Sequence, residues 1–198
     1  EETIKNNKEK IVAIGECGLD YYRIERDEEI LKIEWEEKEK AIKSKKDLQK
    51  IFFKAQIKLA KEYTLPIVIH NRDSRDDVLE ILKETNFKNF IFHCYSEDLE
   101  YAKKLIDFAP NCFLSFSWIV TFKSAIWVQE TAREIDIKHI LAETDSPYLT
   151  PTPFRWKEEN EPFFTKYVIE HIAKIRWEKL DLLWDYIYNN SKKVFNIK

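Results

Sequence analysis

The sequence lacks a long hydrophobic run and any large excess of charge. No apolar stretch approaches the roughly 20 residues that span a bilayer, and the first ten residues, EETIKNNKEK, have no apolar core of the kind found in signal peptides. The 33 basic and 36 acidic residues leave a formal net charge of -3, which gives no global attraction to nucleic acids or anionic membranes. We therefore predict a soluble, cytoplasmic protein without a membrane partner, in which any affinity for phosphate is local.

Methionine, glycine and cysteine are also scarce. Methionine is absent and the chain does not begin with it, so we expect a fragment or a processed product. There are two glycines, Gly15 and Gly18, where average usage predicts roughly 14. The three cysteines are widely spaced and form no Cys-X-X-Cys pair, which argues against a disulfide framework and against a thiolate zinc site.

The sequence does contain an alternation of strand-length apolar runs with longer amphipathic segments. Such alternation is typical of repeated β-then-α units around a parallel sheet. The length suits one domain, so we predict a single α/β domain over residues 1–198. The five runs, each rich in β-branched or aromatic residues, are IVAIGE (11–16), PIVIHNR (66–72), FIFHCYS (90–96), CFLSFSW (112–118) and HILAETDSP (139–147).

Helices are expected between and after these runs. A helix over 47–63 would have a broad apolar face made of Leu48, Phe52, Ala55, Ile57, Leu59 and Ala60. The charged stretch 23–46 indicates a solvated helix or a mobile insertion, with a partner-binding element as the alternative. The proline-rich segment 146–162 predicts a long loop of a kind that is often functional. Further helices are predicted over 75–85, 98–109, 123–135 and 163–175, with two closing helical pieces over 179–195.

Four of the five runs stop at a potential metal ligand or catalytic group: Glu16, His70, His93 and Asp145. Because the carboxyl ends of parallel strands converge on one face of a sheet or barrel, these side chains would meet there. Two imidazoles with two carboxylates suit zinc, manganese or magnesium and could hold two ions. Two such ions would activate water and stabilise a phosphoryl displacement.

Three further residues are candidates for supporting roles. Glu143 precedes Asp145 by two residues and shares its side of the strand, which predicts a partner that orients a metal ligand. Arg72 and Arg155 could hold a phosphate by paired donors, with ordinary surface ion pairs as the alternative. A single histidine at a strand end is more often a hydrogen-bonded core residue, so the repetition at four strand ends is what favours a site.

Five motifs follow one another from residue 11 towards the C-terminus: GECGLDYYR, PIVIHNRDS, FHCYS, LSFSWIVTFK and LAETDSPYLTPTPFR with NEP after it. In this order they resemble the TatD-type metal-dependent deoxyribonucleases of the amidohydrolase superfamily. The resemblance implies a TIM-type (β/α) barrel in which a pair of divalent metal ions hydrolyses phosphodiester bonds of DNA. It also implies an exonuclease that works on single-stranded DNA or 3′ ends, without an obligate protein partner.

The resemblance assigns a role to each of the four residues at the strand ends. Glu16 matches the glutamate that bridges the metals in that family, and His70 and His93 match its two later histidine ligands. Asp145 matches the aspartate that binds metal and orients or deprotonates the attacking water. Expected cofactors are therefore divalent metal ions, two in number, of magnesium, manganese or zinc.

The chain departs from the family's pattern at its N-terminal end. The family's His-X-His pair, which supplies two further metal ligands, occurs nowhere in the 198 residues. We therefore expect an N-terminally truncated, incomplete barrel that lacks about the first three strands and binds metal poorly as it stands. Two alternatives stay open: a hydrolase of another ester, such as an aminoacyl-tRNA ester, and an inactive truncated barrel with weak nucleic-acid binding.

The segment after Asp145 carries two further expectations. Arg155 and Asn160 fall where similar proteins border the substrate groove, so the resemblance implies substrate-binding roles for both. Trp156 stands where similar proteins usually have glycine, as do two other tryptophans, Trp118 and Trp177. One hypothesis is that UGA codons, read as glycine in the source, were translated as tryptophan; the alternative is genuine tryptophans that stack on nucleic-acid bases.

Overall fold

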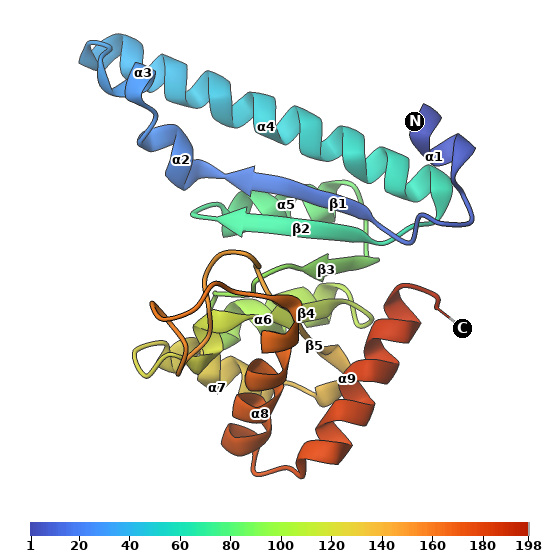
Figure 1. The fold of residues 1–198 in the computed structure, drawn as a ribbon. Coiled ribbons are helices and arrows are strands. Elements are labelled where there is room, and N and C mark those ends of the chain that lie inside the picture. Colours follow the sequence, from blue (N-terminus) through green and yellow to red (C-terminus); the bar gives the residue numbers. More distant parts are fainter. Residues whose placement is uncertain (198) are drawn as a thin grey trace. The chain divides into compact units, whose positions relative to one another are not determined.

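The computed structural model describes residues 1–197, which form helices and parallel strands (Figure 1). The chain divides into two compact units, Glu1–Phe90 and Ile91–Lys198. The first unit contains α1 (Glu2–Asn6), β1 (Ile14–Asp20), α2 (Tyr21–Glu25), α3 (Glu28–Leu31), α4 (Trp35–Tyr63), β2 (Ile67–Arg72) and α5 (Arg75–Glu84). β3 (Phe90–Phe92) starts at the unit boundary. The second unit then contains α6 (Leu99–Phe108), β4 (Phe113–Phe116), η1 (Trp118–Thr121), α7 (Ile126–Glu134), η2 (Ile137–His139), β5 (Ile140–Ala142), η3 (Pro162–Phe164), α8 (Thr165–Arg176) and α9 (Leu180–Val194).

The strands within each unit pair in parallel. β1 pairs with β2, which places Gly18 opposite His70 and Asp20 opposite Arg72, while β4 pairs with β3 and with β5. Each of the five predicted apolar runs overlaps one strand, so the predicted α/β class is confirmed. The strands β3 to β5 are shorter than the runs and almost entirely buried, as expected for strands covered on both faces.

Glu16 does not end its strand, which corrects the expectation from the sequence. The register of β1 against β2 shifts between Ile14 and Cys17, so Glu16 lies at a β-bulge inside β1. A bulge redirects a side chain without ending the strand. The apolar run stops at Glu16, but the backbone hydrogen-bonding to β2 continues to Asp20.

Gly15 and Gly18 allow β1 to lie close to β2. A Cβ atom at residue 18 would lie 2.0 Å from the carbonyl oxygen of His70, and φ there is +149°, a value that L side chains rarely adopt. A Cβ atom at residue 15 would lie 2.7 Å from Cβ of Val68. The two glycines therefore allow the backbones of β1 and β2 to approach each other around the bulge.

The charged stretch 23–46 is mostly helical, since it forms α2, α3 and the first turns of α4. The structure thus agrees with a solvated helix rather than a mobile insertion. α4 has 29 residues and lies along β1 (Figure 1). Its buried residues are Phe53, Ile57 and Ala60, whereas Leu48 and Phe52 are 52% and 62% exposed. The expected apolar face is confirmed at Ile57 and Ala60 and wrong at Leu48 and Phe52, because the row at i, i+4 and i+7 from Phe53 packs inward.

Two long-range hydrogen-bond clusters secure the helices that close the second unit. The Nη1 group of Arg176, at the end of α8, donates to three carbonyl oxygens at the C-terminal end of α7. The side-chain amide of Asn190 donates to two carbonyl oxygens next to β5. Asn190 lies in the C-terminal half of α9, which is one helix and not the two pieces expected. Within the described chain, none of the helices has the length and apolarity that crossing a bilayer requires.

Candidate metal centre

The first unit brings Glu16 and His70 together. The Nδ1 atom of His70 lies 2.7 Å from Oε1 of Glu16, and its Nε2 atom lies 3.3 Å from Oδ2 of Asp20. The parallel register explains this contact, since residue 18 faces His70 across the strands and residues 16 and 20 flank it. The imidazole is therefore bracketed by two carboxylates, one on each side of Gly18.

The Nε2 atom of His70 is shielded from solvent and has no hydrogen-bond partner among residues 1–197. If the proton sits on Nδ1 and is donated to Glu16, Nε2 carries a lone pair. A buried nitrogen lone pair without a donor is costly, and a bound cation would satisfy it. This atom, beside two carboxylates, fits the donor chemistry of a divalent metal ligand.

Asp20 is a site residue that the sequence reasoning missed. It lies at the end of β1, where Gln49 of α4 fixes its backbone by accepting from its N–H at 2.9 Å and donating to its carbonyl at 3.2 Å. The side chain of Asp20 is 16% exposed. The two-residue alternation that relates Glu143 to Asp145 continues from Glu16 through Gly18 to Asp20 and could have identified it.

The second unit brings His93, Glu143 and Asp145 together. The Nδ1 atom of His93 lies 2.9 Å from Oε1 of Glu143, and its Nε2 atom lies 3.7 Å from Oδ1 of Asp145. His93 directly follows β3, and both carboxylates follow β5. The backbone N–H of Cys94 also donates to Oε1 of Glu143, so this oxygen accepts at least two hydrogen bonds. Glu143 thus has the contact that an orienting partner of His93 requires.

Cys94 lies beside this cluster and has a raised pKa. Burial raises the pKa of its thiol to about 12, and the nearby carboxylate of Glu143 adds to the increase. Its Sγ atom lies 2.8 Å from Oγ of Ser117. The donors that His93, Glu143 and Asp145 provide are nitrogen and oxygen.

The three residues that were predicted to bind substrate, Arg72, Arg155 and Asn160, contact aromatic rings or the backbone. Arg72 stacks on the ring of Tyr22, with 3.7 Å between its Cζ atom and the ring centroid, and Arg155 stacks on Phe122 at 3.8 Å. Asn160 is 4% exposed, and its amide nitrogen donates to the carbonyl oxygen of Tyr148 at 2.6 Å. Asn160 therefore stabilises the loop 146–162 from inside.

The ligand atoms are paired with one another instead of being arranged around a metal ion. Among residues 1–197, no group of three or more His, Cys, Asp or Glu side chains has an arrangement that could hold one. The chemical identity of the donors nevertheless fits a divalent ion, because each unit provides one imidazole and two carboxylates. Glu16, His70, His93 and Asp145 as the metal ligands stay a prediction.

Comparison with known proteins gives similar chains that are called metal-dependent hydrolases. YabD of Bacillus subtilis (strain 168) is 42% identical over 191 residues, which are 96% of this chain and 67% of that protein. YcfH of Escherichia coli (strain K12) is 34% identical over 192 residues, which are 96% of this chain and 64% of that protein. The chain thus spans about two thirds of the length of these curated relatives.

Solved structures share the fold. The crystal structure of YJJV, a TatD homolog from Escherichia coli K12, superposes with a TM-score of 0.81 and 22% identity over 100% of this chain and 68% of that one. A hydrolase TatD family protein from Entamoeba histolytica gives a TM-score of 0.73 and 21% identity over 96% of this chain and 65% of that one. These matches confirm the predicted TIM-type barrel arrangement for the part compared. The family model described as TatD related DNase matches residues 1–196, and the chain therefore belongs to the TatD related DNase family.

Proposed function

We propose that this protein hydrolyses phosphodiester bonds of DNA with the help of two divalent metal ions, as an exonuclease acting on single strands or 3′ ends. Membership of the TatD related DNase family supports the reaction class, and relatives named metal-dependent hydrolases support the need for metal. The structural observation that carries the proposal is His70, held by Glu16 at 2.7 Å with a buried Nε2 atom that lacks a hydrogen-bond partner among residues 1–197.

Glu16, His70, His93 and Asp145 are the residues that would hold the metal ions. Such ions, when bound, lower the pKa of a water molecule and offset negative charge on a phosphoryl group. The protein contributes by fixing its ligands beforehand. Glu143 holds the proton of His93 on Nδ1, which leaves the Nε2 lone pair for coordination. Glu16 does the same for His70.

Asp145 and the two arginines would act on the substrate. The Asp145 side chain is 36% exposed, so it can reach a solvent water as well as a ligand. In the proposed mechanism Asp145 orients the attacking water and accepts its proton, because a carboxylate within reach of the water is a suitable general base. Arg72 and Arg155 bind backbone phosphates by their planar guanidinium groups. The reaction then yields a nucleotide and a shortened strand.

A labelled-oligonucleotide assay tests this function. We expect the protein, as its gene encodes it, to release nucleotides from single-stranded DNA in magnesium, manganese or zinc and to stop in EDTA. The variant Glu16→Gln, which keeps the side-chain size but loses the charge, should lose nearly all activity. The exposed Glu37→Gln on α4 is the matched control and should cleave as the unchanged protein does.

Two results would contradict the proposal. Release of amino acids from aminoacyl-tRNA without DNA cleavage would place the protein among hydrolases of another ester. Salt-dependent DNA binding without turnover in any of the three metals would indicate a barrel that binds nucleic acid but does not cleave it.

A further inference from the structure

Tyr22, on α2, has a guanidinium group against each face of its ring. The Cζ atoms of Arg26 and Arg72 both lie 3.7 Å from the ring centroid. Two like-charged planar groups at that distance cannot share one face without overlapping, so they lie on opposite faces. The Cζ atoms of the two arginines are therefore separated by at most twice the 3.7 Å that each lies from the ring centroid of Tyr22.

The hydrogen-bond donors of these two arginines are almost unused. Neither Arg26 nor Arg72 forms an ion pair within the described chain, and Arg26 donates only to the carbonyl oxygen of Tyr22, at 3.4 Å. Arg176 shows the opposite case, because its donors are occupied by carbonyl oxygens and by Glu178. Stacking without ion pairing leaves the planar donor edges of both guanidinium groups available to a ligand.

The stack lies next to the His70 cluster. Arg72 follows His70 by two residues on β2 and so shares its side of the strand, and it stands opposite Asp20 in the register with β1. Tyr22 follows Asp20 by two residues. The two guanidinium groups of Arg26 and Arg72, which pair with no carboxylate within the described chain, favour an anion on the arginine side of the cluster.

We propose that Arg26 and Arg72, clamped on Tyr22, bind a backbone phosphate adjacent to the one that is hydrolysed. The proposal rests on the proposed function and adds a substrate requirement to it: the strand must carry at least one phosphate besides the scissile diester. A planar guanidinium pair matches a phosphate by bidentate hydrogen bonds, and the stacking fixes both groups before binding.

Kinetics on two short substrates test the proposal. One is a dinucleotide with a single phosphodiester, and the other is the same dinucleotide with an additional terminal phosphate. We expect Arg26→Ala to raise KM about tenfold for the second substrate with little change in kcat, and to leave the first unaffected. Arg133→Ala, an exposed arginine paired with Glu134 in the second unit, is the control and should change neither. Equal effects of Arg26→Ala on both substrates, or none, would overturn the proposal.

Binding in EDTA separates this site from the catalytic proposal. With a fluorescent single-stranded oligonucleotide, Arg26→Ala should reduce the slope of log affinity against log salt concentration by about 0.7, the loss of one phosphate contact. If the unchanged protein cleaves no DNA but this slope still falls, the nuclease proposal fails and the phosphate site stands. An unchanged slope would remove the site whatever the activity.

A second inference comes from backbone geometry at two tryptophans. Trp156 and Trp177 have φ values of +67° and +56°, and the two residues are 89% and 93% exposed. The left-handed region is unfavourable for bulky L residues and natural for glycine. An indole that is almost fully exposed gains little burial energy to offset that backbone cost.

Trp177 occupies the position where helices most often end in glycine. It follows α8, its N–H donates to the carbonyl oxygen of Lys174 at 3.3 Å, and the N–H of Glu178 donates to that of Ala173 at 3.0 Å. This pair of bonds is the Schellman motif, in which the left-handed residue is usually glycine. Thr64 has the same position after α4, with φ of +55°.

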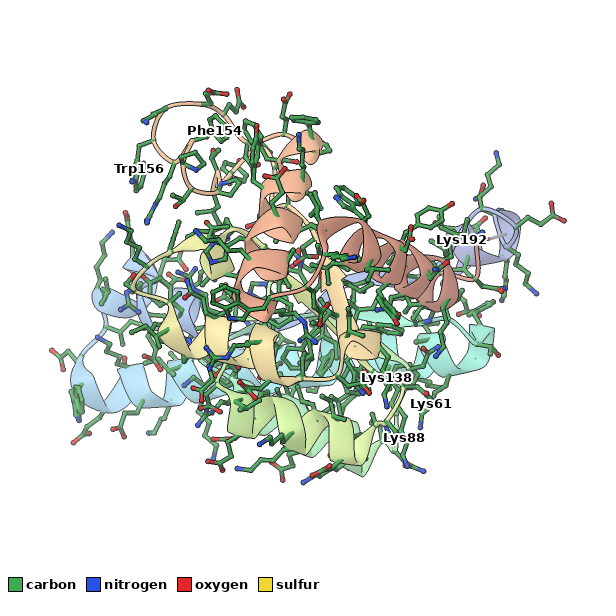
Figure 2. All side chains as sticks on the ribbon, turned by 90° about the horizontal axis from the view of Figure 1, so that it is seen from below. Lys61, Lys88, Lys138, Phe154, Trp156 and Lys192 are labelled. Carbon is green, nitrogen blue, oxygen red and sulfur yellow. The ribbon has the colours of Figure 1, made fainter. Side chains whose placement is uncertain are left out.

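Trp156 lies in the loop that precedes α8 (Figure 2). Phe154, two residues earlier, stacks on Phe164 with ring centroids 5.1 Å apart, whereas the closest described contact of Trp156 is the guanidinium of Arg155, 4.9 Å from its ring. The turn at 156 thus depends on its backbone and not on the indole.

We infer that glycine occupies positions 156 and 177 in the protein made by its source, through UGA codons that the source reads as glycine. The backbone geometry supports the hypothesis from the sequence at Trp156 and Trp177. It does not support it at the third position, because Trp118 opens η1 and lacks a left-handed φ. The inference needs neither the family nor the catalytic proposal to be correct.

The codons at positions 156 and 177 and the masses of the tryptic peptides that contain them test this inference. We expect UGA codons at 156 and 177 and, in the protein isolated from its source, tryptic peptides with the mass of glycine at both positions. In purified variants, Trp177→Gly should raise the melting temperature by a few degrees, with Thr64→Gly as the matched comparison. UGG codons at both positions, or peptides with the mass of tryptophan, would overturn the inference.

Discussion

The Nδ1 atom of His93 lies 2.9 Å from Oε1 of Glu143, the oxygen that also accepts the backbone N–H of Cys94. Replacing Glu143 with glutamine removes the charge that holds the proton of His93 in place. We expect Glu143→Gln to lower metal affinity by about 10-fold to 100-fold, as measured by the metal concentration needed for half-maximal activity. The far-UV circular dichroism should not change. A normal metal requirement in this variant would mean that Glu143 does not orient His93.

Gly18→Ala is expected to be the most damaging small substitution in the first unit. The added Cβ would lie 2.0 Å from the carbonyl oxygen of His70, in a backbone conformation with φ of +149°. We expect a loss of about 4 kcal/mol or more in the free energy of unfolding, measured by urea denaturation. Gly15→Ala meets a side chain, Val68, at 2.7 Å and should cost less, about 1 to 3 kcal/mol. Similar small losses in both would contradict the close approach of the strands.

The sequence predicted the strands well because buried parallel strands have an apolar pattern of their own. It placed a strand in each of five runs, and it singled out both histidines that the structure sets between carboxylates. It misplaced the end of the first strand at Glu16, because a bulge bounded by glycines continues the pairing without continuing the apolar pattern. It could not show the stacking of Arg26 and Arg72 on Tyr22, since such contacts depend on backbone path and not on residue spacing.

Acid should weaken the contact between α2 and α5. Oδ2 of Asp77 accepts from the hydroxyl of Tyr21 at 2.5 Å and from Nζ of Lys50 at 2.8 Å. Burial acts to raise the pKa of Asp77, but the hydrogen bonds from Lys50 and Tyr21 outweigh it and lower the pKa below its ordinary value. The stabilisation is therefore complete above the pKa of the unfolded chain, about 4, and is lost as the pH falls through the folded value.

Urea denaturation at pH 6 and pH 2.5 measures this contribution. We expect Asp77→Asn to lose about 1 kcal/mol at pH 6 and to show a smaller decrease between the two pH values than the unchanged protein. Tyr21→Phe should lose a similar amount at pH 6. An identical decrease with pH in Asp77→Asn and the unchanged protein would show that Asp77 does not contribute to acid sensitivity.

The three cysteines should be inert in the folded protein. Burial raises the pKa of Cys17, Cys94 and Cys112 to about 12 in each case. Because the thiolate is the reactive species, we expect no reaction with a disulfide reagent such as DTNB at pH 8 within minutes, and reaction of all three thiols after unfolding in urea. A fast-reacting thiol in the native protein would contradict the raised pKa of that residue.

α4 has 29 residues, so it is about 43 Å long, and its buried residues Phe53, Ile57 and Ala60 all lie in its C-terminal half. The other half is secured to the preceding turns by two partly exposed ion pairs, Lys45 to Asp27 at 2.6 Å and Lys46 to Glu25 at 3.0 Å. Exposed ion pairs stabilise by at most about 1 kcal/mol and weaken in salt, whereas buried apolar side chains stabilise by more. Amide protons of the N-terminal turns should therefore exchange long before those near Ile57, since one continuous helix contains a segment that opens locally and a segment that opens only with β1.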